Sequence, residues 1–207
     1  MHAVLSQRLA DSVATVSGIA DELPLLAAIA HHLFTCLRDG GTLYFCGNGG
    51  SAADAQHIAA EFVGRFLIER RPLAAVALPC NSSIITAIGN DYSFDEVFSR
   101  QVRALARAGD CVIGISTSGT SRNVLRALEA ARDIGASTIG FTGLSGNALA
   151  KLSDHCFRSR STATPRIQEA HIVAWHLVCE MVEMLVAQTD TQTTQLAAQT
   201  SFSGQPI

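Results

Sequence analysis

A glycine-rich junction near residue 50 constrains the fold of this chain more strongly than any other stretch. The apolar residues 43–46 lead into Cys46-Gly47-Asn48-Gly49-Gly50-Ser51, and an alanine-rich segment follows. This order predicts a buried strand, a tight turn and then a helix, with Ser51 as the helix N-cap. Glycines let the backbone approach a ligand closely, and a helix N-terminus offers free N–H groups and the positive end of a dipole. The junction therefore predicts an anion-binding turn.

The rest of the chain alternates between apolar runs and helical patterns. The runs predict five strands, at about 42–46, 73–78, 111–115, 137–141 and 155–158. Helices are expected between and after them, at about 51–69, 83–88, 94–107, 121–134 and 166–187. Unbroken apolar strands that alternate with helices are typical of a parallel sheet covered on both faces. We therefore predict an α/β fold.

Two further amphipathic helices are expected ahead of the first strand, at about 3–20 and from Asp21 to the stop at Gly40-Gly41. Their apolar faces are expected to close over the core or to contact a second subunit. The helix expected at 166–187 is apolar on nearly all sides, which indicates burial against a partner subunit. After it the composition changes to Gln and Thr. We predict one domain over residues 1–188 and a disordered tail over 189–207.

The composition argues against several classes of function. Hydrophobic residues make up 48% of the 207 residues and charged residues 16%, which suits a large core and subunit interfaces. A net charge of −3 argues against nucleic acid or an anionic membrane as the main partner. No basic region followed by an apolar one opens the chain, and no run of about 18 apolar residues occurs, so we expect a cytoplasmic protein. The single lysine, Lys151, stands in no motif and does not favour Schiff-base chemistry.

A second junction, Ile115-Ser116-Thr117-Ser118-Gly119-Thr120-Ser121, also lies between an expected strand and an expected helix. Hydroxyl groups at a helix N-terminus can hold a phosphate without a fixed positive charge. The alternative is an ordinary Ser/Thr-rich turn with one capping residue. Because open parallel sheets bind ligands at the carboxyl ends of their strands, we expect the two junctions to meet at one edge of the sheet.

Other polar residues stand where acid–base or metal chemistry is possible. His57 and Glu61 lie four residues apart and share one helix face, which indicates either a solvated face or an acid–base or metal pair. Gln168 and His176 interrupt an apolar helix and need polar partners, unless they are core residues satisfied by carbonyl groups. The turn at 88–91 is either a plain turn or a site for sugar hydroxyls.

The sequence resembles the phosphoheptose isomerases of the sugar isomerase (SIS) domain superfamily over about residues 10–186. Four motifs carry the resemblance, in the same order as in that family: residues 47–57 (GNGGSAADAQH), 86–92 (TAIGNDY), 114–119 (GISTSG) and 166–169 (RIQE). The resemblance implies an SIS-type three-layer sandwich with a central five-stranded parallel sheet flanked by helices. It also implies a homotetramer with active sites between subunits.

The same resemblance implies an activity and a set of site residues. The reaction is the isomerisation of D-sedoheptulose 7-phosphate to D-glycero-D-manno-heptose 7-phosphate, the first step of nucleotide-activated heptose biosynthesis. The catalytic residues are Glu61 and His176, and a zinc ion is held in some members by His57, Glu61, Gln168 and His176. Substrate contacts map onto Asn48, Gly49, Gly50, Glu61, Asn90, Asp91, Ser116, Thr117, Ser118, Ser121 and Gln168.

A related branch of the superfamily is a non-catalytic regulator that binds the initiator protein DnaA. It lacks the acidic residue at the Glu61 position and the histidine at the His176 position. Because this sequence has both, it resembles the enzymes more than a sugar-phosphate sensor or regulator. Eight helical residues separate Gln168 from His176 by about 12 Å, so the zinc site is expected less strongly than the acid–base pair. Hexose and pentose phosphates are alternative substrates.

Overall fold

Five parallel strands form a central sheet in the order β2-β1-β3-β4-β5. The computed structural model describes the backbone of residues 1–202 and the side chains of residues 1–190. The strands are β1 (Leu43–Gly47), β2 (Ala75–Ala77), β3 (Cys111–Ser116), β4 (Ser137–Thr142) and β5 (His155–Arg158). β2 is shorter than expected because Leu78 and Pro79 begin a 3-10 turn, and proline has no N–H to donate to the sheet. The sheet confirms the predicted α/β fold.

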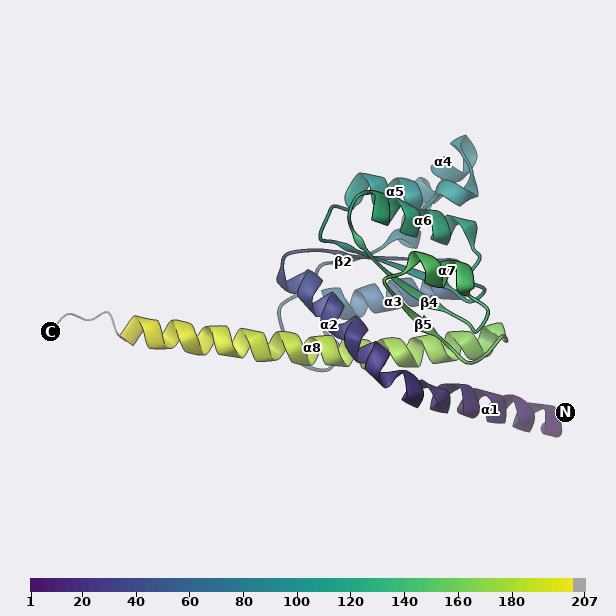
Figure 1. Cartoon of the computed structure of the whole chain (residues 1–207), viewed down its shortest axis with the longest axis horizontal. Helices are drawn as coiled ribbons and strands as arrows, with labels where there is room; N and C mark the ends of the chain where they lie inside the picture. Colours follow the sequence, from purple (N-terminus) through teal and green to yellow (C-terminus); the bar gives the residue numbers. More distant parts are fainter. Residues whose placement is uncertain (203–207) are drawn as a thin grey trace.

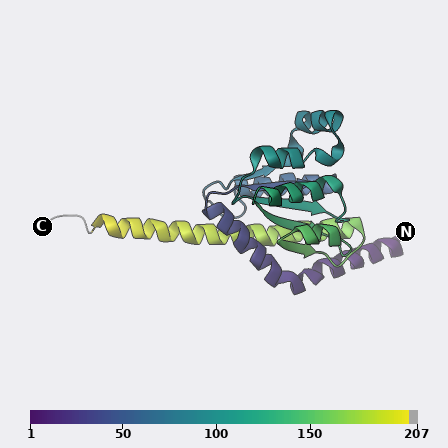
Figure 2. The same cartoon turned by 45° about the horizontal axis from the view of Figure 1, so that its top comes forward.

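Helices cover both faces of the sheet and give the molecule three layers (Figures 1 and 2). Successive side chains of β1 point to opposite faces: Phe45 joins a core with α2, α3 and α8, and Tyr44 joins a second core with α5, α6 and α7. The helices are α1 (His2–Ser17), α2 (Leu23–Arg38), α3 (Gly50–Val63), α4 (Ser82–Asp91), α5 (Ser99–Leu105), α6 (Arg122–Asp133), α7 (Asn147–Leu152) and α8 (Thr164–Phe202), with 3-10 turns η1 (Gly18–Glu22), η2 (Leu78–Cys80) and η3 (Phe94–Glu96).

Helix α3 begins and ends earlier than the sequence led us to expect. Its N-cap is Gly49, at φ +55°, and not Ser51, which lies buried within the first turn. The expectation for Ser51 was wrong because glycine reaches a positive φ easily, so the chain enters the helix before the serine. The helix stops at Val63, short of residue 69, and Gly64 follows it.

Helix α8 is longer than expected. It was predicted to end near Ala187, but the backbone is helical to Phe202; the disorder expected for the tail stays a prediction. Neither glycine nor proline occurs in this stretch, and a helix already held by packing propagates at little cost until such a residue stops it. The last part of the expected tail, 203–207, lies outside the described residues.

Two stretches have the length and composition of a membrane span, His2–Arg38 and Thr164–Asp190, each with a mean hydropathy of 1.5. The fold gives both another explanation. Turn η1 breaks the first stretch into two helices of 16 residues each, shorter than the roughly 20 residues that a span needs. Half of the second stretch is buried in the fold, as in a core helix.

Only part of helix α1 contacts α8. Ser12 Oγ donates a hydrogen bond to Glu169 at 2.7 Å, and Arg166 donates to the carbonyl of Arg8 at 2.6 Å. Most of α1 projects from the body of the molecule (Figure 1), and its apolar side is exposed. The exposed stripe of α1 consists of Val4, Leu5, Leu9 and Val13, which are 58–67% exposed.

Candidate active site

The two predicted ligand-binding junctions meet at the carboxyl edge of the sheet. Strands β1 and β3 are neighbours, paired up to Gly47 and Ile115, so the loops that follow them adjoin. A reciprocal amide pair joins these loops: Asn123 Nδ2 donates to Asn48 Oδ1 at 2.8 Å, and Asn48 Nδ2 donates to Asn123 Oδ1 at 2.9 Å. The glycine-rich turn is thereby fixed to the first turn of α6.

The hydroxyl-rich junction forms a small network at the start of α6. Ser116 Oγ lies 2.9 Å from Ser121 Oγ and 3.5 Å from Ser118 Oγ, and it accepts a hydrogen bond from the Gly119 N–H at 3.2 Å. Ser121 is the N-cap residue, but its side chain makes no capping bond. Because the first N–H groups of a helix have no intrahelical acceptor, this end of α6 presents donors and hydroxyls to an anion.

The asparagine pair is expected to be needed for both stability and activity. Asn123→Ala removes the partner of Asn48, and a half-buried amide without a partner costs about 1–3 kcal/mol. We expect a lower free energy of unfolding in urea and a lower kcat/KM, since the glycine-rich turn loses its anchor. Glu129→Ala, at an exposed position of the same helix α6, is the control and should change neither. An Asn123→Ala protein with wild-type kcat/KM would contradict this role.

Three candidate acid–base residues come together where α3 faces α8. His57 Nε2 lies 3.1 Å from Glu61 Oε1 and 3.3 Å from His176 Nε2. The Phe66 ring stacks on the His176 imidazole with 5.5 Å between centroids. The His57 side chain is 48% exposed and Glu61 24% exposed, so the cluster opens toward the outside of the chain.

The other predicted residues lie in two further places. Gln168 packs against the glycine-rich turn, since a Cβ built on Gly50 would lie 2.2 Å from Gln168 Nε2. Asn90 and Asp91 are exposed at the end of α4, where Asn90 Nδ2 donates to Asp91 Oδ1 at 2.8 Å. Helix α4 stands on the opposite side of the sheet from α8 (Figure 1). One chain therefore does not bring these two residues to Glu61.

Sequence reasoning passed over several residues near the site. Asp54 lies one helical turn before His57, and its Oδ2 is buried without a hydrogen-bond partner. Burial raises the pKa of Asp54 to about 6, against the opposing attraction of His57. The only sequence signal for Asp54 was its place three residues before His57. Asn123 and Phe66 had no sequence signal, because only the fold shows what they contact.

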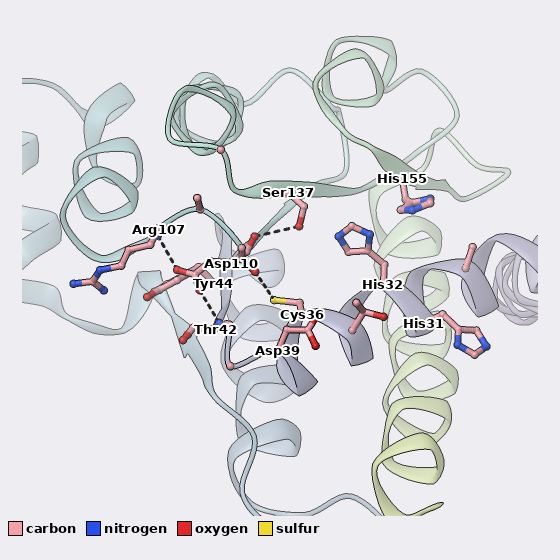
Figure 3. A pocket seen from close by; sticks show the side chains of 17 residues that line it. His31, His32, Cys36, Asp39, Thr42, Tyr44, Arg107, Asp110, Ser137 and His155 are labelled. Carbon is pink, nitrogen blue, oxygen red and sulfur yellow. Dashed lines mark hydrogen bonds between the residues drawn. The ribbon is translucent and has the colours of Figure 1, made fainter. Parts of the chain in front are cut away.

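A cavity of about 860 Å³ lies elsewhere, at the amino ends of the strands (Figure 3). His32 and His155 line it and contact each other edge to face, with 5.4 Å between ring centroids. Burial lowers the pKa of His32, and the charge of the nearby His155 lowers it further. No predicted site residue lines this cavity. Parallel sheets bind ligands at the opposite edge, so the candidate active site is the carboxyl edge.

A parallel sheet with a hydroxyl-rich helix N-terminus at its carboxyl edge and a carboxylate–imidazole cluster between two of its helices is typical of a protein that binds a sugar phosphate. The comparisons agree, because residues 9–143 match the model of the SIS domain. The chain belongs to the SIS domain family, among its phosphoheptose isomerases.

Relatives in both sequence and structure support this membership. The phosphoheptose isomerase of Rhodospirillum rubrum is 54% identical over 165 residues, which cover 80% of this chain and 88% of the relative. That of Roseiflexus sp. is 56% identical over 165 residues, which cover 80% of this chain and 84% of the relative. The structure of phosphoheptose isomerase GmhA from Neisseria gonorrhoeae has a TM-score of 0.83 at 42% identity and covers 88% of this chain and 98% of its own. These matches confirm the SIS-type sandwich with N-terminal helices.

Proposed function

We propose that this chain is an aldose–ketose isomerase that converts D-sedoheptulose 7-phosphate to D-glycero-D-manno-heptose 7-phosphate through an enediol. The observation that carries the proposal is the cluster of Glu61, His57 and His176 on the same domain as a hydroxyl cradle suited to phosphate. The 54% identity to a phosphoheptose isomerase supports the choice of a seven-carbon substrate. This reaction is the entry to nucleotide-activated heptose biosynthesis, and we place it in the cytoplasm.

We propose a role for each part of the site. The Ser116–Ser121 loop and the amides at the start of α6 anchor the phosphate, which fixes the reacting end of the sugar at a set distance. Glu61 moves the proton between C1 and C2. His176 exchanges a proton with the carbonyl and hydroxyl oxygens, since an imidazole can give and take protons near neutral pH. Asn48 and Gln168, beside the glycine-rich turn, face the sugar hydroxyls.

We further propose that a zinc ion binds at this cluster. The three side chains suit the metal. A single proton on His57 Nε2 cannot form full hydrogen bonds to both Glu61 and His176, whereas a cation can bind all three side chains as ligands. His57, Glu61 and His176 would hold the ion, with Gln168 as a fourth ligand. When bound, zinc polarises a carbonyl oxygen as a Lewis acid. Among the described residues no group of three or more His, Cys, Asp or Glu is already arranged around one point, so binding requires side-chain rotation.

Zinc binding can be measured without turnover. Calorimetry with the metal-free protein is expected to show one zinc per chain, and His176→Gln is expected to weaken binding at least 10-fold, because removing an imidazole ligand leaves an incomplete shell. His31→Gln, at an exposed histidine in the opposite cavity, should leave the affinity unchanged. Equal affinities of wild type and His176→Gln would exclude this zinc site.

We propose that the protein is a homotetramer with active sites between subunits. Two features support this: among the described residues the apolar stripe of α1 stays exposed, and α4, which carries Asn90 and Asp91, has no fully buried residue. A neighbouring subunit covers the stripe and brings α4 of one chain to the cluster of another.

Charges in the α1 stripe are expected to dissociate the assembly. Leu5→Glu combined with Leu9→Glu should shift sedimentation from tetramer to smaller species and lower kcat, because two carboxylates oppose burial of the stripe. Gln7→Glu, at an exposed polar position of the same helix, is the matched control. A tetramer that survives the double change would show that α1 is not in the interface.

The activity itself is tested by NMR observation of purified protein with C5, C6 and C7 ketose phosphates. The seven-carbon substrate is expected to have the highest kcat/KM. Inactivity toward every ketose phosphate, with a protein partner captured equally by wild type and Glu61→Gln, would instead identify a non-catalytic regulator.

A further inference from the structure

A buried carboxylate on α8 holds the loop that follows α3. The Glu183 side chain is 2% exposed. Its Oε1 accepts a hydrogen bond from the Phe66 N–H at 2.9 Å, and its Oε2 accepts from the N–H groups of Leu67 at 2.7 Å and Ile68 at 3.0 Å. Residues 64–74 belong to no helix or strand, so this carboxylate supplies acceptors that backbone pairing does not.

An arginine links this carboxylate to the end of α3. Arg70 Nε lies 3.3 Å from Glu183 Oε1, and the Arg70 side chain is 3% exposed. Arg70 also donates to the carbonyl of Glu61 at 2.7 Å and to that of Phe62 at 3.0 Å. Carbonyls in the last turn of a helix have no intrahelical donor, so Arg70 caps the turn of α3 that carries Glu61.

The same loop also reaches the second candidate catalytic residue. Phe66, whose N–H is held by Glu183, stacks its ring on the imidazole of His176 at an interplanar angle of 30°. His176 and Glu183 are seven residues apart on α8, hence on one face and about 10 Å apart along the axis. Glu183 therefore holds the loop that places Phe66 against His176. It also pairs with Arg70, which caps the turn that carries Glu61.

The charge of Glu183 suits this role. Burial favours the neutral acid and raises its pKa, but the N–H groups of Leu67, Phe66 and Ile68 and the Arg70 guanidinium outweigh burial and hold the pKa of Glu183 below its usual value. The group therefore stays ionised in the interior. Hydrogen bonds that involve an ionised acceptor are shorter and stronger than neutral ones, which holds the loop in one conformation.

We propose that Glu183 is a positioning residue for the isomerase site: it seats Phe66 against His176 and, with Arg70, fixes the turn of α3 that presents Glu61. This inference rests on the proposed function, because it deepens the account of that same site. Glu183 acts through its neighbours, because its buried side chain cannot contact the substrate.

The kinetic test compares Glu183→Gln and Phe66→Leu with wild type at a temperature where thermal melts show each protein folded. Both variants are expected to lose kcat about 10- to 100-fold, the range found when supporting hydrogen-bond partners of active groups are removed. KM should change less than about threefold, because the phosphate cradle lies on other loops. Glu69→Gln, whose side chain is 91% exposed on the same loop, is the matched control and should keep wild-type kcat. Wild-type kcat in both variants would overturn the proposal.

A second readout does not depend on turnover. With 13C-labelled histidine, the His176 ring signal is expected to move in both variants, because Glu183→Gln frees the stacked Phe66 ring and Phe66→Leu removes it. The signal should stay in place in Glu69→Gln. If Glu183→Gln does not fold, Glu183→Asp, which keeps the charge but is too short to reach the loop amides, carries both tests. A wild type without isomerase activity but with the expected signal shifts would overturn the proposed function and keep the positioning; unmoved signals would overturn the positioning alone.

Discussion

Replacement of Glu61 by glutamine is expected to lower kcat by a factor of about 10² to 10⁴, the usual contribution of a positioned general acid–base. Glutamine keeps the shape of the side chain but cannot accept a proton from carbon. The loss should appear in kcat and kcat/KM alike, because the phosphate cradle that binds the ground state is unchanged. NMR observation of the seven-carbon ketose phosphate measures it directly.

Two comparisons make this result specific. Glu61 is partly exposed and its contact with His57 is open to solvent, so Glu61→Gln should melt close to the wild-type temperature. Glu69→Gln, 91% exposed beyond the end of α3, should retain full activity. A Glu61→Gln enzyme that kept more than a tenth of wild-type kcat would remove Glu61 from the chemistry.

The parallel sheet could be predicted because most of its strands carry a strong local signal. The runs at β1 and β3 are apolar and continuous, and glycine or Gly-Asp sequences precede β1, β3 and β4. The exact ends of the helices were harder to predict from the sequence. Ser51 looked like a helix cap from its type alone, yet the positive φ of Gly49 starts the helix earlier. The end of α8 was also missed, because a polar composition with no helix breaker does not by itself stop a helix.

The acid–base residues of the site could be predicted from the sequence, but the residues that hold them in place could not. His57 and Glu61 share a helix face by spacing, and the structure adds His176 to them across 119 residues of chain. Glu183, in contrast, reads in the sequence as one more charge on a long helix. Its function depends on three amides more than 110 residues away, which only the packing of α8 on the α3 layer reveals.

The assignment of Asn90 and Asp91 shows a different limit. Both residues belong to a motif that the resemblance places at the substrate, yet one chain leaves them exposed on α4. The discrepancy resolves if the site is completed by a neighbouring chain. Site residues carried by an outlying helix with no buried side chain therefore favour assembly over a site confined to one chain.

A methyl group on Gly119 is expected to have a large effect on the phosphate cradle. Gly119 has φ +66°, and a Cβ there would lie 2.3 Å from the backbone Cα of Gly146 and 2.8 Å from Thr142 Oγ1. The left-handed conformation alone costs about 1–2 kcal/mol with a side chain, and relief of the overlap adds further strain, for a total of about 3 kcal/mol. At about 2–4 °C per kcal/mol, we expect Gly119→Ala to lower Tm by about 6–12 °C.

The same change should weaken phosphate binding, which separates a local effect on the site from general instability. The Gly119 N–H donates to Ser116 Oγ, so a displaced Gly119 breaks the hydroxyl network. We expect KM to rise about 10-fold or more, which is the usual effect of losing one hydrogen bond to a charged group. Gly109→Ala is the control: Gly109 has φ +94° with nothing within 4 Å of the added Cβ, so it carries the conformational strain without the clash. Its Tm should fall by only about 2–8 °C, with KM unchanged. Equal KM values for the two variants would mean that phosphate is not held by this loop.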